Sequence, residues 1–185
     1  MLFQGLIGQQ IGANAWETGP RWYALNTRSN FEKQIAVELK TKGIEHYLPA
    51  YDEVHQWKDR KKKITVPLFP GYLFARFLDE PYLRLKVLAT AGVVRILGNS
   101  SRIEPVPEEQ VEAVRAILNS RLPHFREILL SPGAPVRVIR GALAGVEGTL
   151  VRTKRQARLV ITIPLLGQSI AAEVNAADVE PFGRN

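Results

Sequence analysis

The chain offers few side chains of the kind that carry out covalent or metal chemistry. It has no cysteine, which excludes disulfides, thiolate metal sites and cysteine nucleophiles together. Its histidines, His46, His55 and His124, lack a metal-ligand spacing, and each lies near an aromatic residue or a proline, where packing or surface roles are ordinary. Glu108 and Glu109 suit the first turn of a helix. With no glycine-rich phosphate loop either, we expect no enzyme, no metal and no cofactor.

Aromatic side chains are the second chemically informative group, and they gather in two segments. Trp22 and Tyr23 open the folded part of the chain, and residues 68–74 read LFPGYLF. This density is high for a domain of about one hundred residues, so some of these rings should face a partner. The alternative is that Trp22, Phe69 and Phe74 are ordinary core.

Positive charge is the third informative feature. The 185 residues include 25 Lys and Arg against 18 Asp and Glu, a net charge of +7 that favours a polyanionic partner. The densest positive segment is 58–63, with a solvated loop as the alternative reading. No apolar run is long enough to cross a membrane, and the lack of cysteine fits a cytoplasmic protein. The basic side chains of this segment are Lys58, Arg60, Lys61, Lys62 and Lys63.

The elements that must position these residues fall into two groups. Residues 22–27 predict a strand, and Phe31, Ile35 and Leu39 recur at helical spacing before Gly43. Residues 46–57 and 64–67 predict a hairpin with the charged segment at its tip. A strand at 72–77, a helix at 81–89, a strand at 93–97 and a helix after Pro107 complete an α/β sandwich on a mainly antiparallel sheet.

The remainder of the chain changes character. Residues 135–140, 148–153, 157–163 and 169–174 predict short strands separated by Gly, Pro or charged turns, which together indicate a small β-barrel of the SH3 type. The β-branched run 160–163, followed by Pro164 and Gly167, favours the barrel over any helical form of residues 135–175. We therefore predict an α+β protein with domains at 20–122 and 132–182 and a linker at 123–131. Residues 1–19 are predicted to be a flexible tail, in which the sequence LFQG resembles a protease-site remnant.

The aromatic segments and the glycine-rich pattern at 133–148 are similar to those of the NusG family of transcription elongation factors, whose two domains are called NGN and KOW. The resemblance covers about residues 21–182. Residues 31–39, 56–62 and 90–95 resemble the specialised RfaH and UpxY paralogues more than housekeeping NusG. The resemblance to this family implies a monomeric regulator that has no membrane partner. Such a regulator binds bacterial RNA polymerase, suppresses pausing and promotes processivity or antitermination.

The same resemblance implies three sets of contacts on the first domain. One is an apolar contact with the clamp helices of the largest polymerase subunit, through Trp22, Phe69, Tyr72 and Phe74. A second lies across the DNA channel at Leu83, Arg84 and Leu85, where the sequence departs from the polar His-Thr-Thr pattern of RfaH. The third is DNA of the transcription bubble, bound by Arg28, Lys40, Lys42, Lys86 and the basic segment at 58–63, with a solvated helix face as the alternative.

In relatives the second domain recruits the termination factor Rho or the ribosomal protein NusE. The matching candidates here are Val138, Ile139, Leu143, Leu165 and Leu166, although most apolar residues of a barrel form its core. Two alternatives stay open: a housekeeping NusG role linked to Rho, and an RNA-binding or ribosome-associated KOW protein. The first domain discriminates against the latter, since ribosomal KOW proteins lack it.

Overall fold

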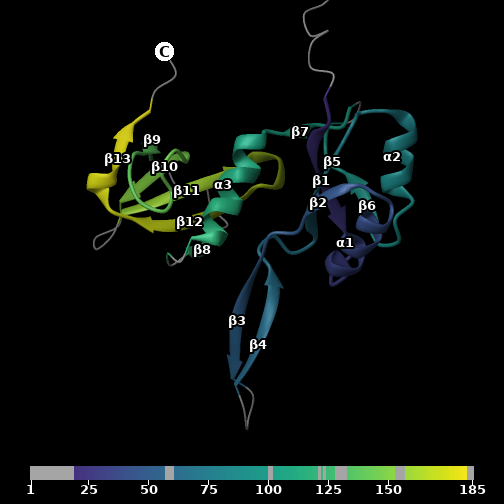
Figure 1. Cartoon of the computed structure of the whole chain (residues 1–185), viewed down its shortest axis with the longest axis horizontal. Coiled ribbons are helices and arrows are strands. Elements are labelled where there is room, and N and C mark those ends of the chain that lie inside the picture. The colour runs from purple at the N-terminus through teal and green to yellow at the C-terminus, as the bar shows by residue number, and fades with distance from the viewer. Residues whose placement is uncertain are drawn as a thin grey trace, which may run out of the picture.

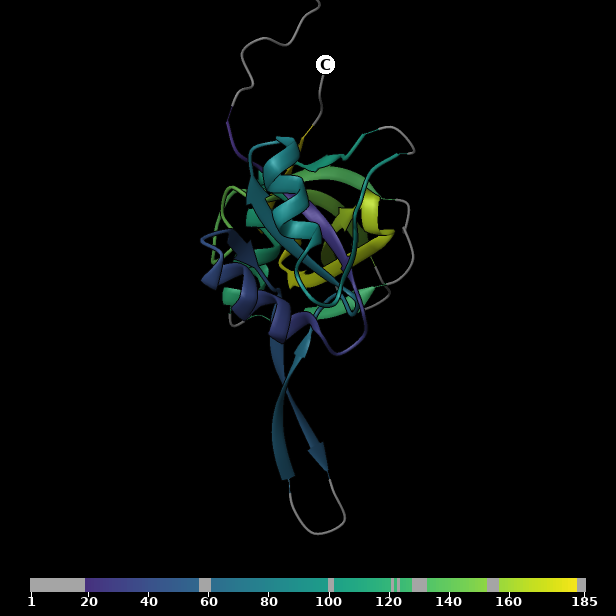
Figure 2. The same cartoon turned by 90° about the vertical axis from the view of Figure 1, so that its right-hand side faces the viewer.

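The computed structural model describes residues 19–56, 61–99, 102–120, 122, 124–127, 133–152 and 157–182. Two sheet-based units lie at the ends of its long axis, and helix α3 (Glu108–Asn119) lies between them (Figure 1). A two-stranded hairpin projects away from both units (Figures 1 and 2). The predicted α+β class is confirmed.

The first unit is built on a five-stranded antiparallel sheet. Four of its strands follow the order β2–β5–β1–β6, and the fifth, β7, pairs with β1. Strand β1 is central because it pairs with β5 along its length and with β6 and β7 on its other edge. Its side chains alternate between the two faces of the sheet, so both faces need covering. The strands are β1 (Arg21–Thr27), β2 (Glu45–Tyr47), β5 (Tyr72–Phe77), β6 (Val93–Ile96) and β7 (Pro105–Val106).

Helices α1 (Glu32–Thr41) and α2 (Pro81–Leu88) serve one face of this sheet. Ile35, Leu39 and Val87 are buried there with Tyr23 and Leu25 of β1, in one apolar cluster. The spacing that predicted α1 therefore marks its core-facing side, and Pro81 begins α2 as expected for a first-turn proline. This side of the domain is a conventional helix-on-sheet core.

Helix α3 packs on the other face of the sheet and also on the second unit. Val111, Val114 and Ile117 are fully buried, in a cluster that contains Trp22 and Phe74 of the sheet as well as apolar residues of the second unit. Burying each such aliphatic side chain contributes about 1.5–3 kcal/mol. The two units therefore share a continuous apolar core through α3.

The second unit is a six-stranded antiparallel sheet in the order β13–β9–β10–β11–β12–β8, and its buried apolar residues belong to the shared core. Two single-turn 3-10 helices, η1 (Pro164–Leu166) and η2 (Ala176–Asp178), connect its last strands. Strand β11 coincides with the β-branched run that favoured a barrel. The strands are β8 (His124–Glu127), β9 (Ala134–Val138), β10 (Glu147–Arg152), β11 (Ala157–Ile163), β12 (Gln168–Val174) and β13 (Val179–Pro181).

The structure differs from the sequence prediction at the junction between the units. Residues 123–131 were expected to be a linker, but 124–127 form β8, which pairs with β12. Pro123 and the mixed polar residues around it are typical of linkers, whereas an edge strand is stabilised by a partner far along the chain. Strands β7 and β13, each of two or three residues, were missed for the same reason.

Gly98 is required by a close approach of two backbone segments. It forms an isolated bridge with Ile103, and a Cβ placed on it would lie 2.2 Å from the carbonyl oxygen of Arg102 and 2.7 Å from the Cα of Ile103. Both contacts are with backbone atoms, which cannot rotate away. Only glycine fits here without moving the chain.

We predict that Gly98→Ala lowers the free energy of unfolding by about 1–3 kcal/mol, because overpacking against backbone displaces the loop. Urea unfolding followed by circular dichroism measures it. Gly19→Ala is the matched control, since nothing lies within 4 Å of a Cβ at that position. Equal stability of the two variants would contradict the backbone-contact argument.

Candidate functional site

The aromatic residues expected to face a partner lie inside the molecule. Trp22 is 2% exposed, and Phe69 and Phe74 are fully buried, their rings in an edge-to-face contact with centroids 6.3 Å apart. Tyr72 is half-buried at the edge of the same cluster. In this conformation Trp22, Phe69 and Phe74 are therefore core residues, which is the alternative that the sequence left open. Of the four predicted clamp residues, Tyr72 alone offers surface.

Helix α3 belongs to the same core cluster and contacts two of its aromatic rings. The guanidinium carbon of Arg115 lies 4.7 Å from the ring centroid of Tyr47 and 6.0 Å from that of Trp22, close enough for cation–π attraction. The indole Nε1 of Trp22 is buried without an acceptor in the described part of the chain. The amphipathic pattern of α3 was visible in the sequence, but which sheet face it covers was not.

Tyr47 marks the boundary between this core and solvent. Burial, with a smaller contribution from Glu112, raises the pKa of its hydroxyl from 10.0 to about 12, against the opposing effect of Arg115. The neutral phenol is therefore the form that the fold stabilises. Tyr47 pairs with Phe74 across strands β2 and β5, which places its ring on the α3 side of the sheet.

The three residues of the second predicted contact lie in different environments on α2. Leu83 packs against the apolar cluster under α1 and α2, and Arg84 forms an ion pair with Asp79 through its Nε. Leu85 is 68% exposed, and the nearby Tyr82 is 70% exposed. Leu85 is the most exposed residue of the predicted set. Tyr82, which no sequence pattern singled out, shares that exposed side at a spacing of three residues.

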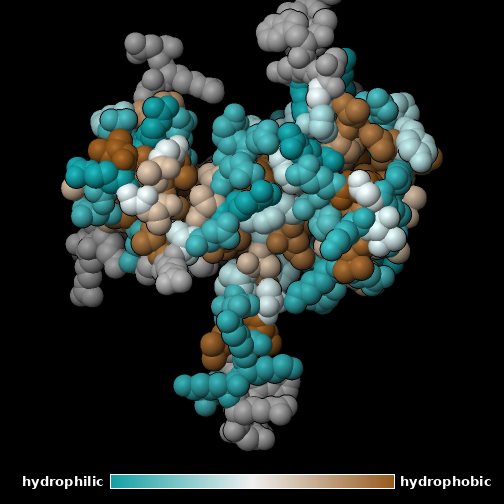
Figure 3. Space-filling model, viewed as in Figure 1, coloured by the Kyte–Doolittle hydropathy of each residue, from teal (hydrophilic) through white to brown (hydrophobic). Residues whose placement is uncertain are grey.

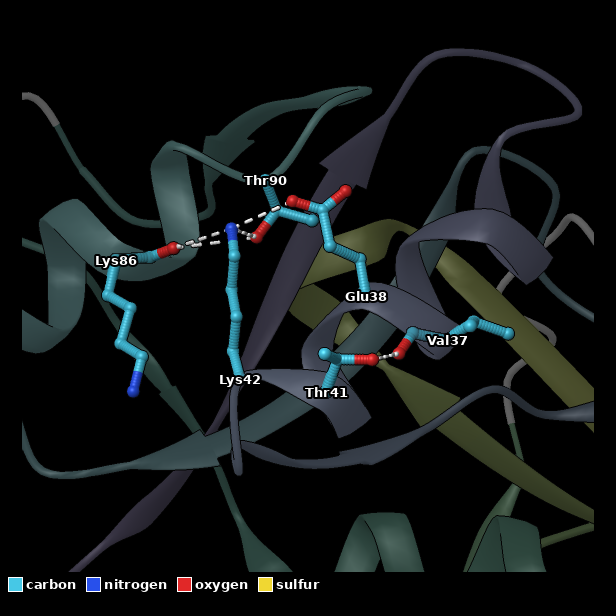
Figure 4. Close-up of polar contacts among 6 residues, drawn as sticks. All are labelled: Val37, Glu38, Thr41, Lys42, Lys86 and Thr90. Atoms are coloured by element: carbon cyan, nitrogen blue, oxygen red, sulfur yellow. Dashed lines mark hydrogen bonds and ion pairs between the residues drawn. The ribbon is translucent and has the colours of Figure 1, made fainter.

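Lys42, predicted to bind DNA, links the end of α1 to the end of α2 through hydrogen bonds (Figure 4). Its Nζ donates to the hydroxyl of Thr90 at 2.8 Å and to the carbonyl of Lys86 at 3.3 Å, and it lies 2.9 Å from the Glu38 carboxylate. Thr90 is buried, so the ammonium satisfies a polar group at the end of α2. The charge of Lys42 is largely committed within the chain.

The other predicted basic residues of this face are less constrained. Lys40 is exposed, the Lys86 side chain points away from Lys42 in Figure 4, and Arg28 is exposed in the turn whose backbone bonds to Gly92. Arg95 of β6 is exposed as well, opposite Asn26 of β1. Its neighbour Ile96 packs toward α1 and α2, so Arg95 lies on the opposite face of the sheet and does not extend this basic surface.

The hairpin of β3 (Ala50–Gln56) and β4 (Lys61–Pro67) carries the densest charge in the chain. Lys61, Lys62 and Lys63 are exposed on β4, and Lys63 pairs with Asp52 at 2.9 Å. The hydrogen bond from Thr65, followed by that from Lys63, lowers the pKa of Asp52. The first three lysines of β4 thus project from an arm that extends beyond the body (Figure 2), whereas Lys58 and Arg60 lie outside the described residues.

The candidate partner residues of the barrel also separate into core and surface. Val138 and Leu143 are buried, whereas Ile139 is 42% exposed beside the turn that precedes β10. Leu165 and Leu166 in η1 are half-buried and pack against the shared core. A protein partner of the barrel would therefore contact Ile139 before the others.

Other kinds of site find no candidates among the described residues. No helix there is both long and apolar enough to span a bilayer. No group of three His, Asp or Glu side chains in that part of the chain could hold a metal ion. His46 lies with its Nδ1 3.1 Å from the carbonyl oxygen of Ile44, and the side chains of His55 and His124 lie outside the described set.

Comparison with known proteins gives one family. A family model described as transcription termination factor nusG matches residues 20–115. The transcription termination/antitermination protein NusG of Helicobacter pylori is 24% identical over 170 residues, covering 86% of this chain and 97% of that protein. The protein of the same name from Staphylococcus aureus is 25% identical over 187 residues, covering 94% and 99%.

A solved structure agrees with the fold. The structure titled "Domain interaction in Thermotoga maritima NusG" aligns with a TM-score of 0.52 over 89% of this chain and 98% of that chain. Its sequence is 18% identical, so the likeness concerns the fold alone.

We predict that Lys42→Met lowers the free energy of unfolding by about 1 kcal/mol, because the buried Thr90 hydroxyl and the end of α2 lose a charged donor. The matched control is Lys40→Met, whose side chain is exposed and should change stability by less than about 0.5 kcal/mol. Denaturant unfolding of both variants measures the difference. A larger loss of stability in the Lys40 variant would contradict the structural role of Lys42.

The raised pKa of Tyr47, about 12 against 10.0 in the unfolded chain, predicts a pH-dependent contribution to stability. The contribution is complete below pH 10 and is lost as the pH rises toward 12, because the unfolded chain releases its phenolic proton first. Tyr47→Phe should therefore lose less stability over this window than the parent chain. Unfolding free energies measured along the window test it, and identical alkaline profiles would refute it.

Proposed function

The chain belongs to the NusG family, and on that premise we propose that it regulates transcription elongation by binding RNA polymerase, suppressing pausing and promoting processivity or antitermination. The observation that carries this proposal is the family match over 20–115, the segment that contains the first sheet, the hairpin, α1, α2 and the start of α3. Residues 20–122 and 132–182 are the proposed NGN and KOW domains.

The polymerase contact is proposed at the aromatic side of the first sheet. Tyr72 of β5 and Tyr47 of β2 are its half-buried rings, and Phe74, opposite Tyr47 in the register, supports them from inside. A partner helix can contact Tyr72 and Tyr47 without disturbing the core. Contact with Trp22 or Phe69 requires α3 or the barrel to move first, because both rings are buried in the core that α3 and the barrel complete.

The second polymerase contact is proposed at the exposed side of α2. Leu85 is the predicted residue that a partner can reach there, since Leu83 packs inward and Arg84 is paired with Asp79. An apolar side chain suits an apolar partner surface and not the polar one that the RfaH pattern would meet. The chemistry of this contact is therefore proposed to differ from that of RfaH.

The nucleic-acid contact is proposed on two basic surfaces. Lys61 and Lys62 have no anionic partner among the described residues, so their charges are available to phosphates of duplex DNA beside the polymerase. Arg28, Lys40 and Lys86 offer a second surface near α1 and α2, suited to the exposed single strand of the transcription bubble.

The mechanism is proposed to be differential binding without covalent chemistry. A protein that contacts both sides of the DNA channel binds the closed, active polymerase more tightly than a paused state with an opened clamp. The extent of pause suppression is bounded by that difference in affinity. The barrel is proposed to recruit Rho or NusE through Ile139, Leu165 and Leu166.

The experiment that tests the proposal is binding of the full chain to bacterial core RNA polymerase, followed by transcription over pause and terminator sites. We expect binding, shorter pauses and increased readthrough at the terminators. Tyr72→Ala should weaken the polymerase affinity, while circular dichroism shows an intact fold. Binding to ribosomes or free RNA without binding to polymerase would refute the proposal and favour the ribosome-associated alternative.

Salt dependence separates the DNA contact from the polymerase contact. We predict that Lys61→Ser combined with Lys62→Ser lowers the steepness of log K against log salt for duplex DNA by about 1.8, at about 0.9 for each phosphate that the variant no longer neutralises. Arg140→Ser, which removes an exposed charge from the barrel, is the control and should leave the slope unchanged. An unaltered slope in the double variant would exclude the hairpin as a DNA contact.

A further inference from the structure

The chain makes a tight turn immediately before Tyr72, the half-buried ring at the proposed polymerase contact. Pro70 and Gly71 are the central residues of this turn, and the amide of Tyr72 donates to the carbonyl of Phe69 at 3.0 Å. Gly71 has a φ of +82°, a conformation that residues other than glycine rarely adopt. Tyr72 then begins β5, so the position of its ring depends on how the turn is fixed. Figure 3 shows the space-filling surface of the molecule.

The carbonyl group of Gly71 is fixed by strand β1. It accepts from the amide of Thr27 at 2.8 Å and from the side-chain amide of Asn26 at 3.3 Å. Both donors lie at the end of β1, and Asn26 is the residue opposite Tyr72 in the register of β1 and β5. This side of the turn therefore continues the hydrogen bonding of the sheet.

The amide of Gly71 is fixed by a side chain of helix α1. It donates to Oε1 of Glu32 at 2.8 Å, and the two residues are 39 positions apart in the sequence. Glu32 is the first residue of α1 and is 4% exposed. Within the described part of the chain its carboxylate has no cationic partner. A backbone N–H of the turn is thus the donor that the structure gives to this buried acid.

The burial of Glu32 is not explained by its place at the start of a helix. An acidic side chain in the first turn of a helix is favourable, but an exposed one such as Glu109 of α3 meets that need. A buried carboxylate loses its hydration and is tolerated where hydrogen bonds replace it. The bond to Gly71 is this replacement, and it joins the first turn of α1 to the turn before Tyr72.

We propose that Glu32 is a positioning residue for the polymerase contact at Tyr72, an inference that rests on the function proposed above. By accepting from the amide of Gly71, Glu32 holds the turn in the arrangement that presents the Tyr72 ring. A ring that is already ordered spares the free energy of ordering it when polymerase binds. The property that matters is an acceptor oxygen at the reach of a Glu side chain, and not the negative charge.

Two conservative variants separate reach from charge. Glu32→Gln removes the charge but keeps an acceptor oxygen at the same reach, whereas Glu32→Asp keeps the charge and is shorter by one methylene. Glu109→Asp makes the same change at an exposed position in the first turn of α3 and is the matched control. We expect Glu32→Gln to behave as the parent chain does, and Glu32→Asp to lose the positioning.

Amide hydrogen exchange of the free full chain, followed by NMR, tests the bond in the absence of polymerase. In Glu32→Asp the Gly71 amide should exchange about tenfold faster, the equivalent of one hydrogen bond to a charged group. In Glu32→Gln it should exchange at the parent rate. The amide of Val138, which donates to Val146 in the barrel, reports on global unfolding and should not change. Unaltered exchange at Gly71 in Glu32→Asp, or equal acceleration at Val138, would overturn the proposal.

A double-variant cycle on the affinity for core RNA polymerase tests the role of the bond. Glu32→Asp should weaken binding by roughly fivefold, the cost of ordering one large side chain, whereas Glu32→Gln and Glu109→Asp should not weaken it. In a Tyr72→Ala background, Glu32→Asp should have no further effect, because the ring that it positions is absent. The same fivefold loss in that background would show a general structural role and refute the positioning role.

These measurements also separate this inference from the proposed function. If the parent chain does not bind polymerase, or if Tyr72→Ala leaves the affinity unchanged, the proposed contact is refuted and the role of Glu32 with it. If Tyr72→Ala weakens binding and Glu32→Asp does not, the contact stands and the positioning role alone is refuted.

Discussion

The packing of α3 on two partners is the interaction on which the rest of the structure depends. One helix contributes Val111, Val114 and Ile117 to a core that includes Trp22 and Phe74 on one side and the barrel on the other. A helix with so wide an apolar stripe must be covered on both sides to keep that surface from water. The sheet covers one side of the apolar surface of α3, and the barrel covers the other.

This arrangement decides which surfaces are open to partners. The rings of Trp22, Phe69 and Phe74 stabilise the interior, while the exposed chemistry consists of charged side chains and of apolar ones such as Tyr82 and Leu85, which share one side of α2. Proteins that work by binding alone need separate surfaces for separate partners. Here the hairpin, α2 and the barrel lie on different parts of the molecule (Figure 1).

Charge is segregated between these surfaces as well. The net charge of +7 includes the exposed lysines of the hairpin and the basic residues on and near α1 and α2. The internal ion pairs refine this picture, because Lys42 and Arg115 support the fold and contribute little to the outer field.

Much of the fold could be predicted from local pattern. The period of Phe31, Ile35 and Leu39 indicated α1, Pro81 and Pro107 marked the starts of α2 and α3, and the β-branched run 160–163 indicated β11. Local pattern is sufficient there because propensity and amphipathicity act between residues close in the chain. The absence of cysteine likewise settled the exclusion of thiolate chemistry.

The candidate site depended on contacts that no local pattern contains. Only the tertiary structure decided that Trp22 and Phe69 are buried in the core that α3 shares with the barrel, that Lys42 is bonded to Thr90, and that 124–127 pair with β12. Each depends on the docking of elements far apart in the chain. Side-chain type determined what chemistry was available to this protein, and long-range packing determined which of it reaches the surface.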